Sequence, residues 1–228
     1  MSRPLLLGHR GLRSRSLSLR ENTIPAFDLA LQHGCDGFEF DVRLTADDRA
    51  VICHGSRFAG ITIARSACNR LQALPLLEDV LARYADRAFL DIELKVPGVE
   101  CCLIEALSRF RPQRGYVVSS FLPEVLIDLR KRSQSVPLGI ICETRKQLSC
   151  WRELQVEYVI LHERLITPAL MAELHAAGKK VFGWTINKKV SMIRLAGLGV
   201  DGIVSDKTEL LVGVCGPDEA SRISISPA

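Results

Sequence analysis

Short apolar runs alternate with amphipathic helical patterns along the chain, and this alternation sets the narrowest limits on its fold. Nine runs are candidate strands: Pro4–Gly8, Gly37–Val42, Ala50–His54, Ala88–Leu94, Tyr116–Ser119, Leu138–Ile141, Tyr158–Leu161, Lys180–Thr185 and Gly202–Ser205. Several are apolar throughout, which is typical of strands buried on both faces of a parallel sheet. Helical patterns between them begin at capping residues, such as Thr23 before Pro25 and Thr167 before Pro168. The alternation predicts an α/β fold with a parallel sheet.

The connection between the second and third candidate strands is short. Only Arg43 to Arg49 separate them, whereas a parallel crossover needs about a dozen residues or more. We therefore expect Ala50–His54 to be an extra strand that returns antiparallel to Gly37–Val42. The other eight strands fit a distorted (β/α)8 barrel. A doubly wound open sheet is the alternative, although no G-x-G-x-x-G motif follows an expected strand.

A single barrel domain accounts for residues 1–228. Within it, Gly55–Leu74 shows no clear period and is expected to be a short cap loop that carries at most a short helix. The tail 216–228 is rich in serine and proline and is expected to be loosely held.

Composition narrows the class of protein further. A net charge of +4 is too small for the dense basic patches of nucleic-acid-binding domains, so no nucleic-acid partner is expected. No run of about 18 apolar residues is present, so we expect no transmembrane segment. The eight cysteines include no C-x-x-C pair, which favours a reduced, cytoplasmic protein. Its oligomeric state stays open.

Carboxylates gather where the expected strands end, which is where (β/α)8 barrels carry their active groups. Glu39 and Asp41 are two residues apart on one strand, so they share a face, and Glu93 ends the next barrel strand. Converging carboxylates repel one another unless a cation neutralises them. Oxygen ligands favour one divalent cation, Mg²⁺ or Ca²⁺, with Mn²⁺ possible. The alternative is a structural ion network with Arg10 and Lys95.

Two histidines follow expected strands. His9 comes after the first strand and His54 ends the return strand. Histidine titrates near neutrality, so these two are candidates for a general acid and a general base. Either one alone is equally well a hydrogen-bonded histidine at a strand end. His33, just before Gly34, is expected to cap a helix, and His162 also follows a barrel strand.

Nine segments, in the same order, resemble glycerophosphodiester phosphodiesterases. They are His9-Arg10-Gly11, Glu21-Asn22-Thr23, Glu39-Phe40-Asp41-Val42, Val51-Ile52-Cys53-His54, Leu76-Leu77-Glu78-Asp79-Val80-Leu81, Glu93-Leu94-Lys95, Ser119-Ser120-Phe121, Gly183-Trp184-Thr185-Ile186-Asn187 and Gly199-Val200-Asp201-Gly202-Ile203-Val204-Ser205-Asp206. They extend over roughly residues 5 to 211. The ordered set is far more specific than any one segment.

The resemblance implies a distorted barrel that hydrolyses small glycerophosphodiesters to an alcohol and glycerol 3-phosphate. It also implies a role for each of nine residues: Glu39, Asp41 and Glu93 hold a divalent cation, His9 and His54 are the general acid and base, Arg10 and Lys95 contact the phosphate, and Phe121 and Trp184 wall the pocket. The nucleophile is either water or a hydroxyl of the substrate.

The chain departs from the family after the second histidine. The family usually has an aspartate there, and this chain has Gly55. An Arg-Thr-Thr element is missing, and Gly55–Leu74 is shorter than the family's usual insertion. The more open mouth keeps a phospholipase-D-like or lysophospholipase-like activity on larger lipids under consideration. The change at Gly55 keeps a non-catalytic protein that binds phosphate metabolites under consideration.

Overall fold

The strands close into a barrel in the computed structural model, which describes residues 3–12 and 18–217. Nine strands follow the order β1-β11-β10-β9-β8-β7-β6-β2-β3, and β1 also pairs with β2, so eight parallel strands form a ring. The ring strands are β1 (Leu5–Gly8), β2 (Gly37–Leu44), β6 (Phe89–Leu94), β7 (Tyr116–Ser120), β8 (Leu138–Cys142), β9 (Tyr158–His162), β10 (Lys180–Trp184) and β11 (Gly202–Ser205). The predicted (β/α)8 barrel is confirmed.

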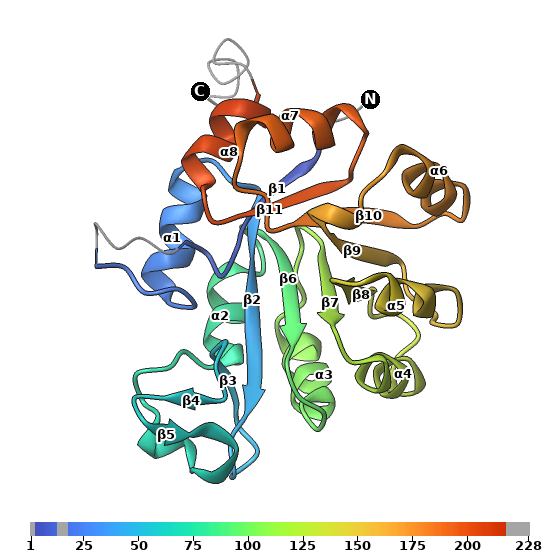
Figure 1. Ribbon diagram of the computed structural model, residues 1–228. Helices are drawn as coiled ribbons and strands as arrows, with labels where there is room; N and C mark the ends of the chain where they lie inside the picture. Colours follow the sequence, from blue (N-terminus) through green and yellow to red (C-terminus); the bar gives the residue numbers. More distant parts are fainter. Residues whose placement is uncertain (1–2, 13–17, 218–228) are drawn as a thin grey trace.

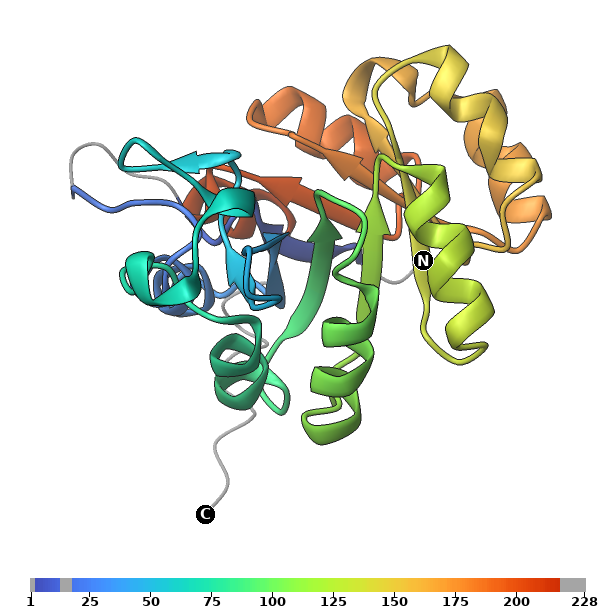
Figure 2. The same cartoon turned by 90° about the horizontal axis from the view of Figure 1, so that it is seen from below.

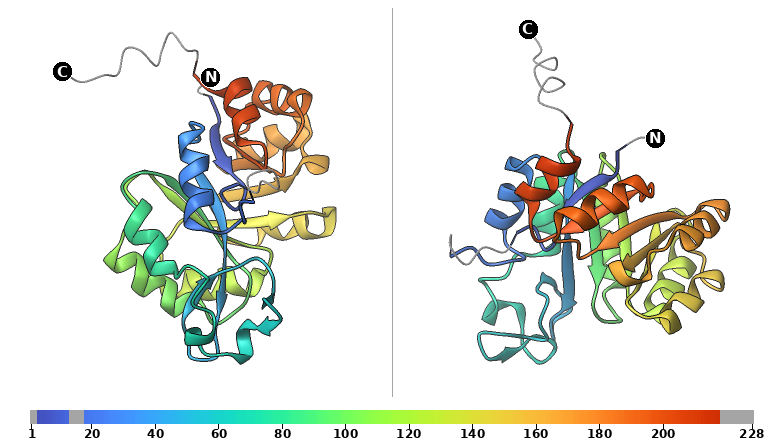
Figure 3. Two further views of the ribbon diagram at one scale, coloured as in Figure 1. Left: turned by 90° about the vertical axis from the view of Figure 1, so that its left-hand side faces the viewer. Right: turned by 45° about the horizontal axis from the view of Figure 1, so that its top comes forward.

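Helices surround the ring on its outside (Figure 1; Figure 2). They are α1 (Ile24–Gln32), α2 (Leu77–Tyr84), α3 (Glu100–Arg109), α4 (Pro123–Arg132), α5 (Arg145–Leu148), α6 (Pro168–Ala176), α7 (Lys189–Gly197) and α8 (Thr208–Cys215). Thr23 and Thr167 cap α1 and α6 through their side chains, and His33 is the C-cap of α1, as expected. The last helix, α8, packs beside β1, so the two ends of the described chain meet (Figure 3).

The predicted return strand is present as β3 (Ala50–Ile52), which pairs antiparallel with β2. The expectation for Gly55–Leu74 was wrong in one respect. This segment, called the cap below, contains a small antiparallel hairpin of β4 (Arg57–Phe58) and β5 (Ile61–Thr62), followed by two 3₁₀ turns. Strands of two residues are too short to show a period in the sequence. The cap lies beside the carboxyl end of β2 (Figure 1).

Alternating side chains of the ring strands enter two separate cores. One face packs against the helices, as Phe38 and Phe40 do, with Phe27 of α1 stacked on Phe38 at 4.2 Å between ring centroids. The other face fills the barrel, where Leu7, Phe89, Val117, Ile141, Tyr158, Ile160, Phe182 and Val204 form a buried plug. Because side chains alternate along a strand, the carboxylates of β2 and β6 continue this inner face towards the carboxyl ends.

A third, smaller core lies under the cap and is built from Val51, Cys53, Ile63, Leu71 and Leu74. It explains how a segment with little regular structure keeps its shape. The eight cysteines are all free thiols. Within residues 3–12 and 18–217, the helices are all too short or too polar to cross a lipid bilayer. Most of the predicted tail, residues 218–228, lies outside the described residues.

Candidate active site

Three carboxylates meet at the carboxyl end of the barrel, called the mouth below. Glu39 and Asp41 lie on β2, and Glu93 lies on β6 directly opposite Asp41 in the parallel register. One oxygen from each lies within 4.8 Å of the others, and all three side chains are buried. The Oε1 atom of Glu39 is buried without a hydrogen-bond donor. The strand register therefore assembles an oxygen-only group that can hold a metal.

Burial raises the pKa values of two of the three carboxylates in this cluster. Burial, reinforced by the charges of Asp41 and Glu93, raises the pKa of Glu39 well above its ordinary value. Burial and the charge of Asp41 raise the pKa of Glu93 to about 7. Without a cation, Glu93 therefore binds a proton near neutral pH, and the raised pKa of Glu39 favours its protonated form as well. A bound cation would take the place of those protons.

Asp41 is the anchor of the cluster. Its Oδ2 accepts a 2.7 Å hydrogen bond from the Asn22 amide, and its Oδ1 lies 3.1 Å from Nδ1 of His54. Burial alone would raise the pKa of Asp41. The hydrogen bond with His54 and the positive charges of Lys95 and Arg10 outweigh burial and hold this pKa well below its usual range. Asp41 is therefore charged even while its side chain is fully buried.

Two positively charged side chains, Lys95 and Arg10, face the carboxylates. Lys95 Nζ lies 2.6 Å from Glu93 Oε1 and 3.3 Å from Asp41 Oδ1. Arg10 pairs with Asp41 at 3.2 Å and with Glu21 at 2.8 Å. Arg10 has a positive φ of 54°, and its backbone N–H donates to Glu39 Oε2 at 2.8 Å. The ion network considered as an alternative thus exists, and it surrounds the same carboxylates that form the metal-binding group.

His9 is held by a carboxylate at the mouth. Its Nδ1 lies 2.7 Å from Oδ1 of Asp206, and its Nε2 lies 3.9 Å from Glu39 Oε2. Asn187 donates to the other oxygen of Asp206 at 2.6 Å. Burial opposes ionisation of Asp206, but the hydrogen bond with His9 lowers its pKa overall. An ionised Asp206 accepts the Nδ1–H of His9, which leaves Nε2 facing the carboxylate cluster.

His54 has the same arrangement on the other side of the cluster. Its Nδ1 contacts Asp41, and its side chain is 43% exposed, so Nε2 is accessible. Arg43 donates two hydrogen bonds, of 3.0 and 2.8 Å, to the backbone carbonyl of His54 and fixes the chain where β3 has ended. Each histidine therefore has one nitrogen anchored by a carboxylate and one free for proton transfer.

A cavity of about 230 Å³, called the mouth cavity below, contains most of the predicted site. Its walls include His9, Arg10, Glu39, His54, Glu93, Lys95, Phe121 and Trp184. Phe121 and Trp184 touch edge to face at 5.5 Å between ring centroids and form an apolar part of the wall, with Lys95 Nζ 5.5 Å from the centre of the Phe121 ring. Asp41 lies beneath, in contact with His54. The structure thus brings all nine residues predicted from the sequence to one place.

Several residues of the site were not predicted from the sequence as functional. Asp206 directly follows β11, so the strand-end pattern that marked Glu93 could also have marked it. Asn22 was quoted only within a segment of the resemblance. Its contact with Asp41 spans 19 positions and leaves no local signal. Asp91 and Glu143 also line the mouth cavity, and burial raises the pKa of Asp91 to about 7. His162 lies against Trp184, 5.6 Å between ring centroids, outside the charged cluster.

Fold and site together define a class of protein. Two anchored histidines, three carboxylates and two positively charged side chains surround one small cavity at the mouth of a (β/α)8 barrel. Such a site has the groups that acid–base chemistry on a small anionic molecule requires.

Comparison with known proteins identifies the family. The model of the glycerophosphoryl diester phosphodiesterase family matches residues 9–79 and 65–210. A glycerophosphodiester phosphodiesterase from Caldanaerobacter subterraneus subsp. tengcongensis is 30% identical, over 92% of this chain and 97% of the relative. A probable glycerophosphodiester phosphodiesterase 2 from Mycobacterium tuberculosis is also 30% identical, over 91% and 89%.

Solved structures share the fold. A putative glycerophosphoryl diester phosphodiesterase from Silicibacter pomeroyi has a TM-score of 0.84 at 21% identity and covers 94% of this chain and 93% of its own. A phosphodiesterase from Oleispira antarctica, in complex with the product sn-glycerol-3-phosphate, has a TM-score of 0.80 at 23% identity, covering 93% and 96%. This chain belongs to the glycerophosphoryl diester phosphodiesterase family and is a phosphoric diester hydrolase.

Proposed function

We propose that this protein hydrolyses glycerophosphodiesters to an alcohol and glycerol 3-phosphate, with one divalent cation and with His9 and His54 as the acid–base pair. The observation that carries the proposal is the pair of anchored histidines that line the same cavity as the carboxylate cluster. His9 is held by Asp206 and His54 by Asp41, so each presents its second nitrogen. A protein that only binds phosphate has no use for two such groups.

The residues present fit a divalent cation. Glu39, Asp41 and Glu93 supply only oxygen atoms, which suits Mg²⁺, Ca²⁺ or Mn²⁺. The buried Oε1 of Glu39 lacks a hydrogen-bond donor, and a cation would satisfy it. When bound, the cation supplies positive charge that neutralises the phosphodiester and polarises phosphorus.

The chain's own residues carry out the remaining steps. Arg10 and Lys95 line the mouth cavity and add positive charge beside the phosphate. One histidine takes the proton of the nucleophile, and the other gives a proton to the departing alcohol. The bond from phosphorus to the alcohol oxygen breaks as the bond to the nucleophile forms. The nucleophile is either water or a hydroxyl of the glycerol, which would give a cyclic phosphate first.

The substrate's glycerol half has a natural place in the mouth cavity. Its carbon atoms fit the wall of Phe121 and Trp184, and about 230 Å³ suits a ligand of this size. The Oleispira antarctica relative was solved in complex with its product sn-glycerol-3-phosphate, which supports a substrate that contains glycerol. Larger lipids are the second candidate, because the short cap covers less of the mouth.

A substrate panel tests the proposal. The purified protein is incubated with glycerophosphodiesters and with lysophospholipids, each with Mg²⁺, Ca²⁺ or Mn²⁺ or with chelator, and the released alcohol is measured. Release from glycerophosphodiesters that depends on a cation supports the proposal. Release from lysophospholipids alone would favour the second candidate, and binding without turnover would favour a phosphate-binding protein.

A further inference from the structure

A second hollow meets the catalytic residues from the side of the cap. It is a groove of about 290 Å³ lined by Leu19, Arg20, Glu21, Asn22, Ile52, Cys53, His54, Gly55, Phe58 and Leu74. His54 also lines the mouth cavity, so this one side chain borders both hollows. A phosphodiester has two substituents on phosphorus, and a phosphate at His54 has a hollow available for each of them.

The two hollows differ in the polar groups that they leave unused. In the mouth cavity, the buried Nε1 of Trp184 has no hydrogen-bond partner. The carboxylate of Glu143 also has no partner among residues 3–12 and 18–217. Glycerol brings two hydroxyl groups that need such partners. The mouth cavity is therefore the better place for the glycerol half.

In the groove, by contrast, the buried polar groups are already engaged. Both polar atoms of the Asn22 side chain bond to Asp41, and Glu21 pairs with Arg10. Apart from Arg20, His54 and Gly55, the rest of the lining is apolar: Leu19, Ile52, Cys53, Phe58 and Leu74. An apolar group placed here leaves no buried polar atom unsatisfied, whereas a strongly polar group would lose its contacts with water.

Arg20 gives the rim of the groove a positive charge and ties its two walls together. The guanidinium carbon lies 4.6 Å above the centre of the Phe58 ring, and one guanidinium nitrogen donates to the carbonyl of Ala73 at 3.0 Å. These contacts connect the loop before α1 to the cap. A cationic alcohol such as choline would approach a like charge here, whereas a neutral alcohol would not.

We propose that this groove is the subsite for the departing alcohol and that it selects neutral, apolar alcohols. The inference rests on the proposed function, because it concerns the second half of the same substrate. Leu19, Phe58 and Leu74 supply the contact surface, and Arg20 disfavours cationic groups. The short cap is then one wall of a binding groove rather than a gap in the active site.

A homologous series of substrates tests the apolar part of the proposal. The esters are glycerol 3-phosphate joined to ethanol, butanol and hexanol, with glycerophosphoglycerol as the reference. We expect kcat/KM to rise by about two- to fourfold per added methylene, because a fully buried methylene contributes about fourfold. Phe58→Ala and Leu19→Ser should each flatten this rise in kcat/KM with chain length, while Phe58→Leu should restore most of the rise.

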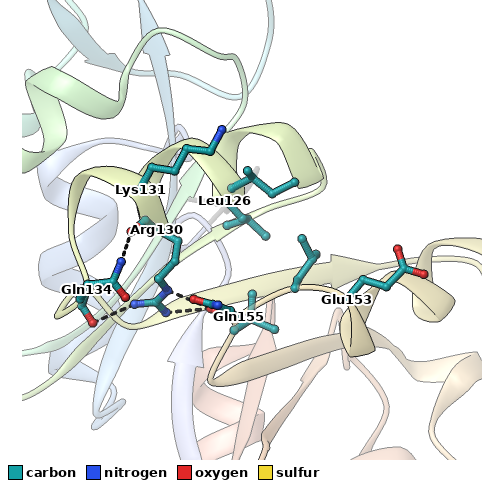
Figure 4. A pocket seen from close by; sticks show the side chains of 9 residues that line it. Leu126, Arg130, Lys131, Gln134, Glu153 and Gln155 are labelled. Atoms are coloured by element: carbon teal, nitrogen blue, oxygen red, sulfur yellow. Dashed lines mark hydrogen bonds between the residues drawn. The ribbon is translucent and has the colours of Figure 1, made fainter.

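A matched control comes from another surface hollow. Ile127 is 45% exposed and lines a cavity between α4 and the segment before β9. Figure 4 shows this cavity, with Arg130 and Gln155 among its labelled residues. Ile127→Ser removes similar apolar surface far from the mouth and should leave the series unchanged. Thermal unfolding of each variant shows whether it is folded, and Leu19→Ser serves as the test if Phe58→Ala is not.

Choline and its neutral isostere, 3,3-dimethylbutanol, test the charge. We expect the dimethylbutyl ester to have the higher kcat/KM by about threefold at low salt, and Arg20→Gln to narrow this difference. A kcat/KM that does not change with chain length, or a rise that survives both Phe58→Ala and Leu19→Ser, would overturn the groove assignment. If glycerophosphoglycerol is hydrolysed normally in that case, the proposed function stands without the subsite. If none of the esters is hydrolysed, both fail.

Discussion

Nδ1 of His54 lies 3.1 Å from Oδ1 of Asp41, so a proposed acid–base residue directly contacts a proposed metal ligand. Asp41 also accepts a hydrogen bond from Asn22 and pairs with Lys95. The buried aspartate therefore links the position of the cation to the orientation of the histidine. In our proposal, binding of the cation and proton transfer share this one side chain.

Replacement of the histidines tests their proposed roles. His9→Ala and His54→Ala should each lower kcat by about 10² to 10⁴, the usual effect of removing a general acid or base. Both side chains border a cavity, so the melting temperature should change little. Activity assays and thermal unfolding measure the two effects. A variant that keeps wild-type turnover would remove that histidine from the mechanism.

Asp206→Asn tests the anchor of His9. The amide keeps the shape of the side chain but loses the charge that holds the Nδ1–H of His9. A hydrogen bond to a charged group is worth about 1.5–3 kcal/mol, so we expect kcat to fall by about 10- to 100-fold. The dissociation constant of the cation should stay within about twofold, since Asp206 is not among the three carboxylates. A large loss of cation affinity would instead mean that Asp206 is a ligand.

Cation affinity should rise with pH. The pKa of Glu93 is raised to about 7, so below pH 7 Glu93 must lose a proton before it can bind a cation, and the raised pKa of Glu39 acts in the same direction. Affinity is weakened below the raised pKa and recovers above it. From pH 6 to pH 8 we expect at least about tenfold tighter binding by calorimetry, with proton release. Glu93→Gln should bind more weakly, with a smaller pH dependence. Equal affinity at both pH values would contradict the assigned ligands.

Arg130 should contribute to stability without affecting catalysis. It is 9% exposed, and its guanidinium donates to the carbonyls of Gln134 and Gln155 (Figure 4). It also donates to the carbonyl of Val136 and to the Glu157 carboxylate, and all four partners lie at the amino end of the barrel. Arg130→Ala leaves these carbonyls without donors and should cost about 2–4 kcal/mol in the free energy of unfolding. Arg130→Lys should recover only part of this free energy of unfolding, because lysine lacks the planar guanidinium group with its several N–H donors. Denaturant unfolding measures the loss, and an unchanged kcat is the control.

Much of the fold could be predicted from the sequence because its strands are buried on both faces. Short apolar runs, several of them apolar throughout, marked all nine strands of the large sheet, and the short link after Val42 marked the antiparallel return. The β4–β5 hairpin was missed, because its strands have only two residues each and are held by a small core that forms only after folding. The local sequence pattern was therefore sufficient to predict the barrel, whereas the structure of the cap depends on tertiary packing.

The site could also be predicted in part from the sequence. Residues at strand ends were found because the parallel barrel brings those ends together, as with Glu39 and Glu93. Partners that act through long-range hydrogen bonds were not found as such. Asn22 reaches Asp41 from a loop, and Asn187 reaches Asp206 from beyond β10. Neither has a periodic or compositional signal, so only the folded structure reveals them.

The central claim is that this mouth hydrolyses glycerophosphodiesters with a cation and two histidines. The most direct measurement is ³¹P NMR of glycerophosphoglycerol incubated with the wild-type protein, with cation or with chelator, and with His9→Ala and His54→Ala. We expect the glycerol 3-phosphate signal to grow for the wild type with cation and to be absent with chelator. In each histidine variant with cation, the signal should grow at least about 100-fold more slowly. Equal product formation in chelator, or in either histidine variant, would contradict it.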